Sequence, residues 1–133
     1  MSAGFNVGDS LPELHVTPDA GLTKRYAEAS GDMNPIHIDE EFAKSVGLPG
    51  CILHGLWSMA QVARAHTAVA DGDPRALKRL SVQFRGMGFP EREIVVTAKV
   101  TEANGNRIVT ETVAAQGDSE IIRNASATLE LDD

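Results

Sequence analysis

A change of hydrophobic period near Pro74 constrains the fold of this chain more than any other feature. From Gly55 to about Ala70, apolar and small residues recur at a helical spacing and predict one long, mostly buried helix. The turn pairs Asn104-Gly105 and Gly117-Asp118 lie farther along the chain. Four segments after Pro74 alternate apolar and polar residues at a period of two, as half-buried strands do: "LKRLSVQF", "EIVVTAKVTEA", "RIVTETVAAQ" and "EIIRNASATLEL".

One long helix followed by antiparallel strands is typical of an α+β domain with two layers. We expect the apolar face of the sheet to pack on the helix. The same segregation argues against a βαβ dinucleotide-binding fold. The chain has 133 residues and no visible repeat or linker, which suits one core better than two, so we expect residues 1–133 to form a single domain.

The first half of the sequence predicts two shorter helices. In "TPDAGLTKRYAEAS", Thr17 is suited to cap a helix, Pro18 to its first position, and Gly31 to the stop that follows. In "IDEEFAKSVG", Asp39 is the expected cap and Gly47 the expected end. A short extended piece, Leu14 to Val16, precedes both.

Charge and composition narrow the class of function. The formal net charge of −7 argues against nucleic-acid binding, which needs a basic surface. An anionic ligand would require a local basic patch. Four cations lie on or beside the predicted strands and can form one: Lys78, Arg79, Arg85 and Arg92. The alternative is that they are scattered, solvated charges.

The single cysteine, Cys51, fits a reducing compartment, and no cation adjoins it to make it a nucleophile. No apolar run approaches the roughly 18 residues of a membrane span. The first 16 residues lack the pattern of a signal peptide. We therefore expect a cytoplasmic protein that does not enter a membrane.

The segment from Asp32 to His37 gathers an acid, an amide, a proline and a histidine. Pro35 breaks any helix there and Asn34 is pushed toward an extended shape, so a rigid kinked loop is expected. Such a loop can bring the carboxylate of Asp32 and the imidazole of His37 to one water as an acid/base pair. The alternative is that Asp32 caps a turn and His37 is an interior histidine.

A second candidate is the pair His54-Gly55 at the start of the long helix. Backbone N–H groups there have no partner within the helix, so that of Gly55 can stabilise an oxyanion unless glycine serves packing alone. His54 can line the site or bond the adjoining loop, and we favour the loop. Asp32, His37 and His54 show no familiar metal-ligand spacing, and we expect no metal.

These residues also carry a resemblance. "YAEASGDMNPIHIDEEFA" resembles the signature of the MaoC-like, (R)-specific enoyl-CoA hydratase family, and "ILHGLWSMA" resembles its His-Gly step into a central helix. "LSVQFRGMGFPEREIVV" is similar to its strand with phenylalanine followed by a proline, except that "PERE" at Pro90 to Glu93 replaces a common glycine. The matching signature residues are Tyr26, Ser30, Gly31, Asp32, Asn34, Pro35, His37 and Ala43.

The resemblance implies a hot-dog fold, a long helix wrapped by a curved antiparallel sheet. It implies reversible hydration of trans-2-enoyl thioesters to (R)-3-hydroxyacyl thioesters without a cofactor. Asp32 and His37 would activate water and the Gly55 N–H would hold the thioester oxygen. Asn34, Tyr26 and His54 would support the pair or contact substrate.

The implied partners are an acyl thioester of coenzyme A or of acyl carrier protein and a second subunit. A homodimer or larger homo-oligomer is expected, and a heterodimer is possible on the same resemblance. A non-catalytic acyl-binding or structural subunit of such a heterodimer, and a thioesterase, are the alternative functions. The presence of both Asp32 and His37 argues against the first, and the Asp-x-Asn-Pro-x-His loop fits the second less well.

Overall fold

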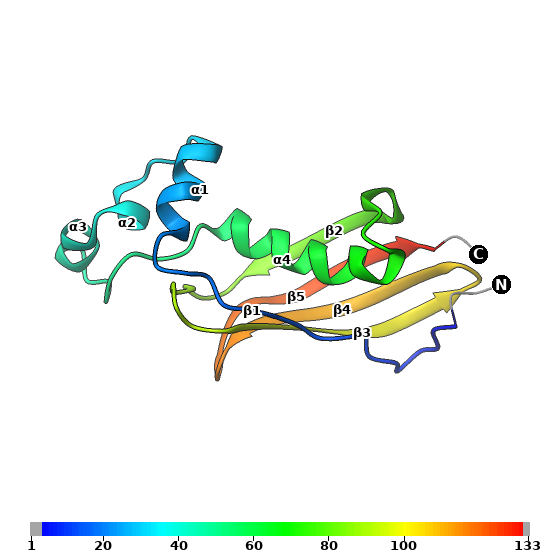
Figure 1. Cartoon of the computed structure of the whole chain (residues 1–133). Coiled ribbons are helices and arrows are strands. Elements are labelled where there is room, and N and C mark those ends of the chain that lie inside the picture. The colour runs from blue at the N-terminus through cyan, green and yellow to red at the C-terminus, as the bar shows by residue number, and fades with distance from the viewer. Residues whose placement is uncertain (1–3, 132–133) are drawn as a thin grey trace.

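A computed structural model describes residues 4–131, which form a five-stranded antiparallel sheet and a set of helices (Figure 1). The strand order is β1-β3-β4-β5-β2. The helices are α1 (Leu22–Ser30), α2 (Pro35–Ile38), α3 (Glu40–Ser45) and α4 (Gly55–Thr67), with short 3-10 turns at Ala68–Ala70 and Pro74–Ala76. The strands are β1 (Leu14–Val16), β2 (Leu77–Phe84), β3 (Ile94–Asn104), β4 (Arg107–Gln116) and β5 (Ser119–Glu130).

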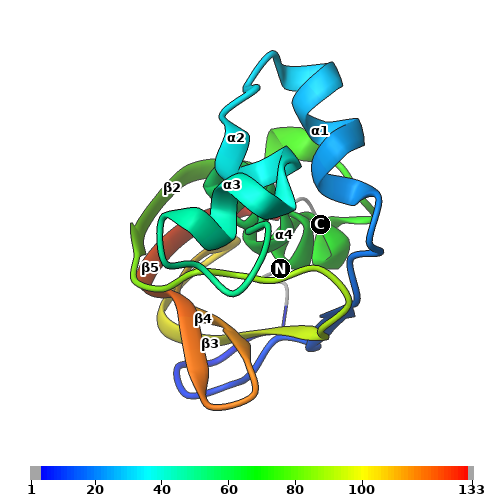
Figure 2. The same ribbon diagram turned by 90° about the vertical axis from the view of Figure 1, so that its left-hand side faces the viewer.

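The sheet curves around α4, as the view along the helix shows (Figure 2). Alternate residues of β3, from Ile94 to Val100, point inward and are buried. Ile94 and Val96 pack in one core cluster with Val62 and Ala65 of α4 and Ile122 of β5, whereas Ala98 and Val100 belong to a second cluster near the far end of the sheet. The predicted two-layer packing of sheet on helix is confirmed. The helix is buried on one face rather than mostly buried as predicted, since the buried residues among its 13 are Ser58, Gln61, Val62, Ala65 and His66.

A buried histidine, His66, links α4 to strand β4 by a side-chain hydrogen bond. His66 is fully buried, and its Nδ1 lies 2.7 Å from the carbonyl oxygen of Val62, one helical turn earlier. A carbonyl only accepts, so Nδ1 carries the proton and Nε2 accepts from the Thr110 hydroxyl at 2.7 Å. Burial lowers the pKa of His66. The side chain is therefore a neutral link that fixes the helix on the strands.

The predicted start of α1 is wrong. A helix that began at Pro18 would use the Pro18 carbonyl to accept the N–H of Leu22. Instead that carbonyl accepts the N–H of Glu91 at 2.6 Å, and Leu22 donates to Asp19 at 3.2 Å. A contact with a distant loop thus outcompetes the local helix signal of Thr17 and Pro18, whereas Gly31 ends α1 in a left-handed conformation as expected.

The expected loop from Asp32 to His37 is wrong in its second half. Asn34 is extended, as predicted, and its side-chain oxygen accepts the N–H of Ile36 at 3.2 Å. Pro35 then occupies the first position of α2, where its missing N–H costs nothing. His37 consequently stands on a single helical turn rather than on a loop. Asp39 caps α3 as predicted.

Glu91 occupies a backbone conformation that favours glycine. Its φ is +68°, in the left-handed region where a side chain costs roughly 1–2 kcal/mol. Glu91 belongs to the "PERE" segment, where the sequence departs from the resemblance.

The four basic residues do not form one patch. Lys78 and Arg79 begin β2, while Arg85 follows its far end, about 20 Å away at the usual rise of a strand. Lys78 also lies 3.9 Å from Glu130, and Arg92 lies over the ring of Phe89. Within residues 4–131, no helix is long and apolar enough to cross a membrane.

The buried state of His66 predicts how stability depends on pH. Its pKa is lowered from 6.5 in the folded protein, so unfolding takes up a proton and stability falls as pH drops below about 6.5. We expect His66→Gln to lose less unfolding free energy than the wild type between about pH 7.5 and 5.5, measured by urea unfolding. His54, whose pKa is also lowered, leaves a residual dependence in the variant. Identical pH dependence in both proteins would contradict this reading.

Candidate active site

A cavity of about 280 Å³ lies where α1, the Asp32 turn, the start of α4 and the end of β2 meet. It brings together residues that are far apart in the sequence. Its lining consists of Tyr26, Ser30, Asp32, His54, Gly55, Leu56 and Phe84. Four of the six predicted site residues line it, and His37 adjoins it through Asp32, as described next.

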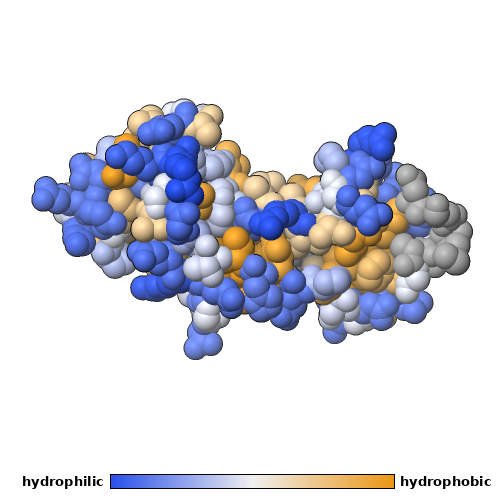
Figure 3. All heavy atoms as spheres, viewed as in Figure 1, coloured by the Kyte–Doolittle hydropathy of each residue, from blue (hydrophilic) through white to orange (hydrophobic). Residues whose placement is uncertain are grey.

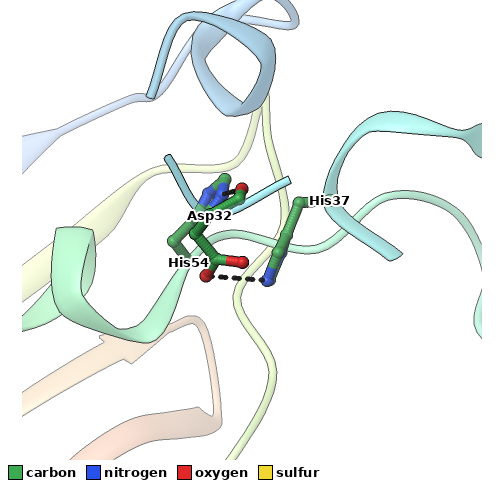
Figure 4. A group of neighbouring side chains, drawn as sticks. All are labelled: Asp32, His37 and His54. Atoms are coloured by element: carbon green, nitrogen blue, oxygen red, sulfur yellow. Dashed lines mark hydrogen bonds and ion pairs between the residues drawn. The ribbon is translucent and has the colours of Figure 1, made fainter. Parts of the chain in front are cut away.

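Asp32 and His37 face one another across a short gap (Figure 4). Oδ2 of Asp32 lies 3.9 Å from Nε2 of His37. That distance is too long for a direct hydrogen bond and suits a water that contacts both atoms. The Asp32 side chain is half exposed, whereas that of His37 is almost fully buried. The pair thus combines a carboxylate open to solvent with a fixed imidazole.

The hydrogen bond made by Nδ1 of His37 determines the tautomer of this ring. Nδ1 lies 2.8 Å from the carbonyl oxygen of Ile52, which can only accept, so Nδ1 carries the proton of the neutral ring. Nε2 is therefore an unprotonated base directed at Asp32. The N–H of Ile52 in turn donates to the carbonyl of Ile36, which binds the strand-like segment before α4 to α2.

Local turns hold the carboxylate of Asp32. Its Oδ1 accepts the backbone N–H of Asn34 at 3.3 Å, and its own N–H donates to the hydroxyl of Ser30 at 3.2 Å. The side chain of Asn34 caps α2 and makes no hydrogen bond to either side chain of the pair among the described residues. The support that Asn34 gives in this structure is thus through its backbone and through the cap.

His54 contacts both members of the pair. Its Nε2 donates to the backbone carbonyl of Asp32 at 3.1 Å, the loop bond favoured from the sequence. Its ring stacks on that of His37, with centroids 3.9 Å apart and planes inclined by 21°. The ring of Tyr26 also contacts the ring of His54, with centroids 4.6 Å apart and planes inclined by 50°. Burial is the main reason that the pKa of His54 is lowered.

Gly55 begins α4, as predicted, and its exposed N–H meets no hydrogen-bond acceptor within residues 4–131. The helix dipole adds partial positive charge at this end. A Cβ placed on Gly55 would lie 3.2 Å from the ring of Phe84. The space beside this glycine is therefore bounded by an aromatic ring.

The predicted site residues omit Ser30, Leu56 and Phe84 of this cavity, and of these Phe84 is the one that bounds the space beside Gly55. It ends the edge strand β2, and its ring is half exposed in the described structure. The period-two pattern does place it on the face of Leu80 and Val82, which pack on the core. That signal identifies an apolar position but not the contact with Gly55, which arises only when β2 and α4 are brought together.

The three residues Asp32, His37 and His54 have ligand atoms within 4.8 Å of one another, but their arrangement does not fit a metal. A metal binds imidazole nitrogen in the plane of the ring at about 2.0–2.1 Å. Two ring planes that are stacked 3.9 Å apart and inclined by only 21° converge far beyond that distance. One nitrogen of each ring is also engaged by a backbone carbonyl.

Cys51 lies outside the cavity, beside a second hollow near Pro90. Burial, followed by the neighbouring carboxylate of Glu40, raises the pKa of its thiol. A thiolate nucleophile is not formed there at neutral pH.

Comparison with known proteins assigns the chain to a family. Residues 9–124 match the family model described as MaoC like domain. The fatty acid synthase subunit beta of Schizosaccharomyces pombe is 37% identical over 137 residues, which cover 97% of this chain and 6% of that protein. Enoyl-CoA hydratase ChsH3 of Mycobacterium tuberculosis is 33% identical over 119 residues, 86% of this chain and 40% of that protein. The chain thus spans less than half the length of these relatives.

Solved structures agree with the sequence relatives. A MaoC-like dehydratase superposes with a TM-score of 0.91 at 30% identity, over 98% of this chain and 42% of that one. R-Hydratase PhaJ1 from Pseudomonas aeruginosa has a TM-score of 0.85 at 21% identity, over 98% of this chain and 85% of that one. The helix wrapped by an antiparallel sheet is the fold expected from the sequence. The chain belongs to the MaoC-like family and has its hot-dog fold.

Proposed function

We propose that this protein adds water to trans-2-enoyl thioesters and forms (R)-3-hydroxyacyl thioesters, reversibly. The observation that carries the proposal is the Asp32–His37 pair beside the free N–H of Gly55 at one cavity. The names of relatives support the reaction class, since they include enoyl-CoA hydratases from Mycobacterium tuberculosis and Arabidopsis thaliana. The single domain expected over residues 1–133 stays a prediction.

The pair is suited to hold one water by both of its hydrogens. Oδ2 of Asp32 and the unprotonated Nε2 of His37 are both acceptors, and they lie 3.9 Å apart. A water between them donates one O–H to each and turns a lone pair away from both. That lone pair is then available to attack the β carbon of an enoyl group lying in the cavity.

Proton and charge balance follow from this arrangement. As the water oxygen bonds to the β carbon, one member of the pair takes its proton, and electrons move toward the thioester oxygen. The Gly55 N–H donates to that oxygen, a type of contact worth about 2.7–4 kcal/mol in the transition state. The pair then delivers a proton to the α carbon, which restores the site, and acid–base help of this kind contributes about 10²–10⁴-fold.

The carrier of the acyl group is either coenzyme A or acyl carrier protein. Relatives of both kinds occur, because the fatty acid synthase beta subunits stand beside the enoyl-CoA hydratases. The reaction at the α and β carbons is the same for both. Lys78 and Arg79 lie far from Arg85 along β2, so these three cations do not form one basic surface for a carrier protein.

A second subunit remains part of the proposal. The outer edge of β2 pairs with no strand within residues 4–131, and an open edge favours association. Apolar surface is exposed across the middle of the molecule (Figure 3), and Leu56 and Phe84 beside the cavity are among the exposed apolar side chains. One structural neighbour is the ChsH1-ChsH2 complex of Mycobacterium tuberculosis, which shares the fold. Homodimer and heterodimer both stay predictions.

The direct test is hydration of enoyl-CoA substrates of graded chain length, followed by loss of absorbance of the conjugated thioester. We expect turnover with an (R)-3-hydroxyacyl product, identified by chiral chromatography. Exhaustive treatment with EDTA should leave the rate intact because the site does not fit a metal. A rate lost to EDTA and restored by zinc would instead support a metal held by Asp32, His37 and His54.

The acid/base pair predicts a pattern among three variants. Asp32→Asn keeps the shape and removes the charge, and His37→Ala removes the proton carrier. We expect each to lower the hydration rate by about 10²–10⁴-fold while the protein stays folded. The double variant should be little worse than either single one, because the two groups act as a unit. Near wild-type rate in either folded single variant would end the assignment.

Gly55 predicts a graded effect that involves Phe84. A Cβ at 3.2 Å from the Phe84 ring requires only a small shift of a half-exposed side chain, so Gly55→Ala should reduce turnover mildly and Gly55→Val strongly. The Gly55→Ala exchange repeated in a Phe84→Ala protein is the matched control, because it removes that contact. Thermal unfolding measured alongside the hydration rate separates an oxyanion-binding role from a packing role. If the rate falls only as far as the folded fraction falls, Gly55 is a packing residue.

A further inference from the structure

His54 contacts both members of the pair and, like His37, is buried. It is 2% exposed, and it precedes the first residue of α4. Its Nε2 bonds the backbone carbonyl of Asp32, and one face of its ring stacks on the ring of His37 (Figure 4). The two residues it joins approach each other only through a 3.9 Å gap. Their relative position therefore depends on a third side chain.

The two nitrogens of His54 define its protonation state. Nε2 faces a carbonyl, so it carries the proton of the neutral ring. Nδ1 is buried and has no hydrogen-bond partner among the described residues. A second proton on Nδ1 would create a buried N–H without an acceptor, in a ring stacked on His37. The groups that face the ring are the Asp32 carbonyl, the His37 imidazole and the Tyr26 ring, and the Asp32 carboxylate lies within 4.8 Å of a ring nitrogen. That carboxylate favours a charged ring, but burial is the larger effect and lowers the pKa of His54.

Neither nitrogen of His54 is available to a ligand in the cavity. Nε2 is engaged by Asp32, and Nδ1 is inaccessible. The residue lines the cavity with its other atoms. Any effect of His54 on the reaction is therefore indirect, through the positions of Asp32 and His37.

We propose that His54 is a positioning residue, which stays neutral while His37 exchanges protons and which fixes the distance between Asp32 and His37. The hydrogen bond from His54 Nε2 to the Asp32 carbonyl fixes the position of the Asp32 turn. The stacking of His54 on His37 fixes the plane of the His37 ring, whose Nδ1 donates to the carbonyl of Ile52. This role rests on the proposed hydratase function for its kinetic consequence. The structural part, a neutral Nε2–H tautomer, is independent of any substrate.

Three substitutions separate the two contacts. His54→Gln keeps a donor at the reach of Nε2 and loses the stack, His54→Phe keeps the ring and loses the donor, and His54→Ala loses both. We expect about 10²-fold lower kcat for His54→Ala, the effect of misplacing reacting groups by about 1 Å, and about tenfold for each of the others. KM should change by less than about threefold, since no nitrogen of His54 meets the ligand. His15→Gln, at an exposed histidine away from the cavity, is the matched control.

A role in packing alone gives a different result. It predicts that His54→Phe, which fills the space, is fully active and that the other two lose activity only as far as their folded fraction falls in thermal unfolding. Equal kcat for wild type and His54→Phe would therefore overturn the positioning role, as would losses confined to KM.

The wild-type protein supplies a readout that needs no activity. In nitrogen-15 NMR across about pH 8 to 5, we expect His54 to keep the neutral Nε2–H signature while the exposed His15 titrates. Titration of His54 near 6.5, or an Nδ1–H tautomer, would overturn the proposal even if hydration is observed. If the wild type hydrates no enoyl thioester, the proposed function fails, and the NMR signature still decides whether His54 is the neutral link.

Discussion

The packing of α4 inside the curved sheet is the contact on which the remaining structure depends. Val62 and Ala65 of the helix pack in the core against the sheet, and His66 fixes the helix by a hydrogen bond to Thr110. With the helix fixed, its first residue, Gly55, has a defined position relative to the end of β2. The oxyanion-binding capacity proposed for Gly55 is therefore a property of the core as much as of the site.

The remainder of the candidate site is built from short-range turns that are joined by a few long-range bonds. Asp32 is held by the turn from Ser30 to Asn34, and His37 by the single turn of α2. The backbone N–H and carbonyl of Ile52 and the ring of His54 connect these pieces to the segment that enters α4. An exposed carboxylate and a buried imidazole can thus be held face to face without a direct bond between them.

The period of the apolar residues was sufficient to predict α4, four strands and the way they pack. The local signals failed where a distant group intervened: Thr17 and Pro18 look like a helix start, but the Pro18 carbonyl bonds Glu91 instead. The motif from Asp32 to His37 identified candidate chemistry, and the family likeness supplied the proposed roles. The stack of His37 on His54 and the contact of Phe84 with Gly55 could not be predicted, because they exist only after segments distant in sequence have met.

The buried state of Cys51 has a practical consequence for studying this chain in solution. The chain has one cysteine, and both its burial and the raised pKa of its thiol protect it from electrophilic reagents. A cysteine introduced at an exposed position away from Cys51, such as Glu102 of β3, would then react selectively with a maleimide dye. Site-specific fluorescent labelling therefore requires no prior removal of the native thiol.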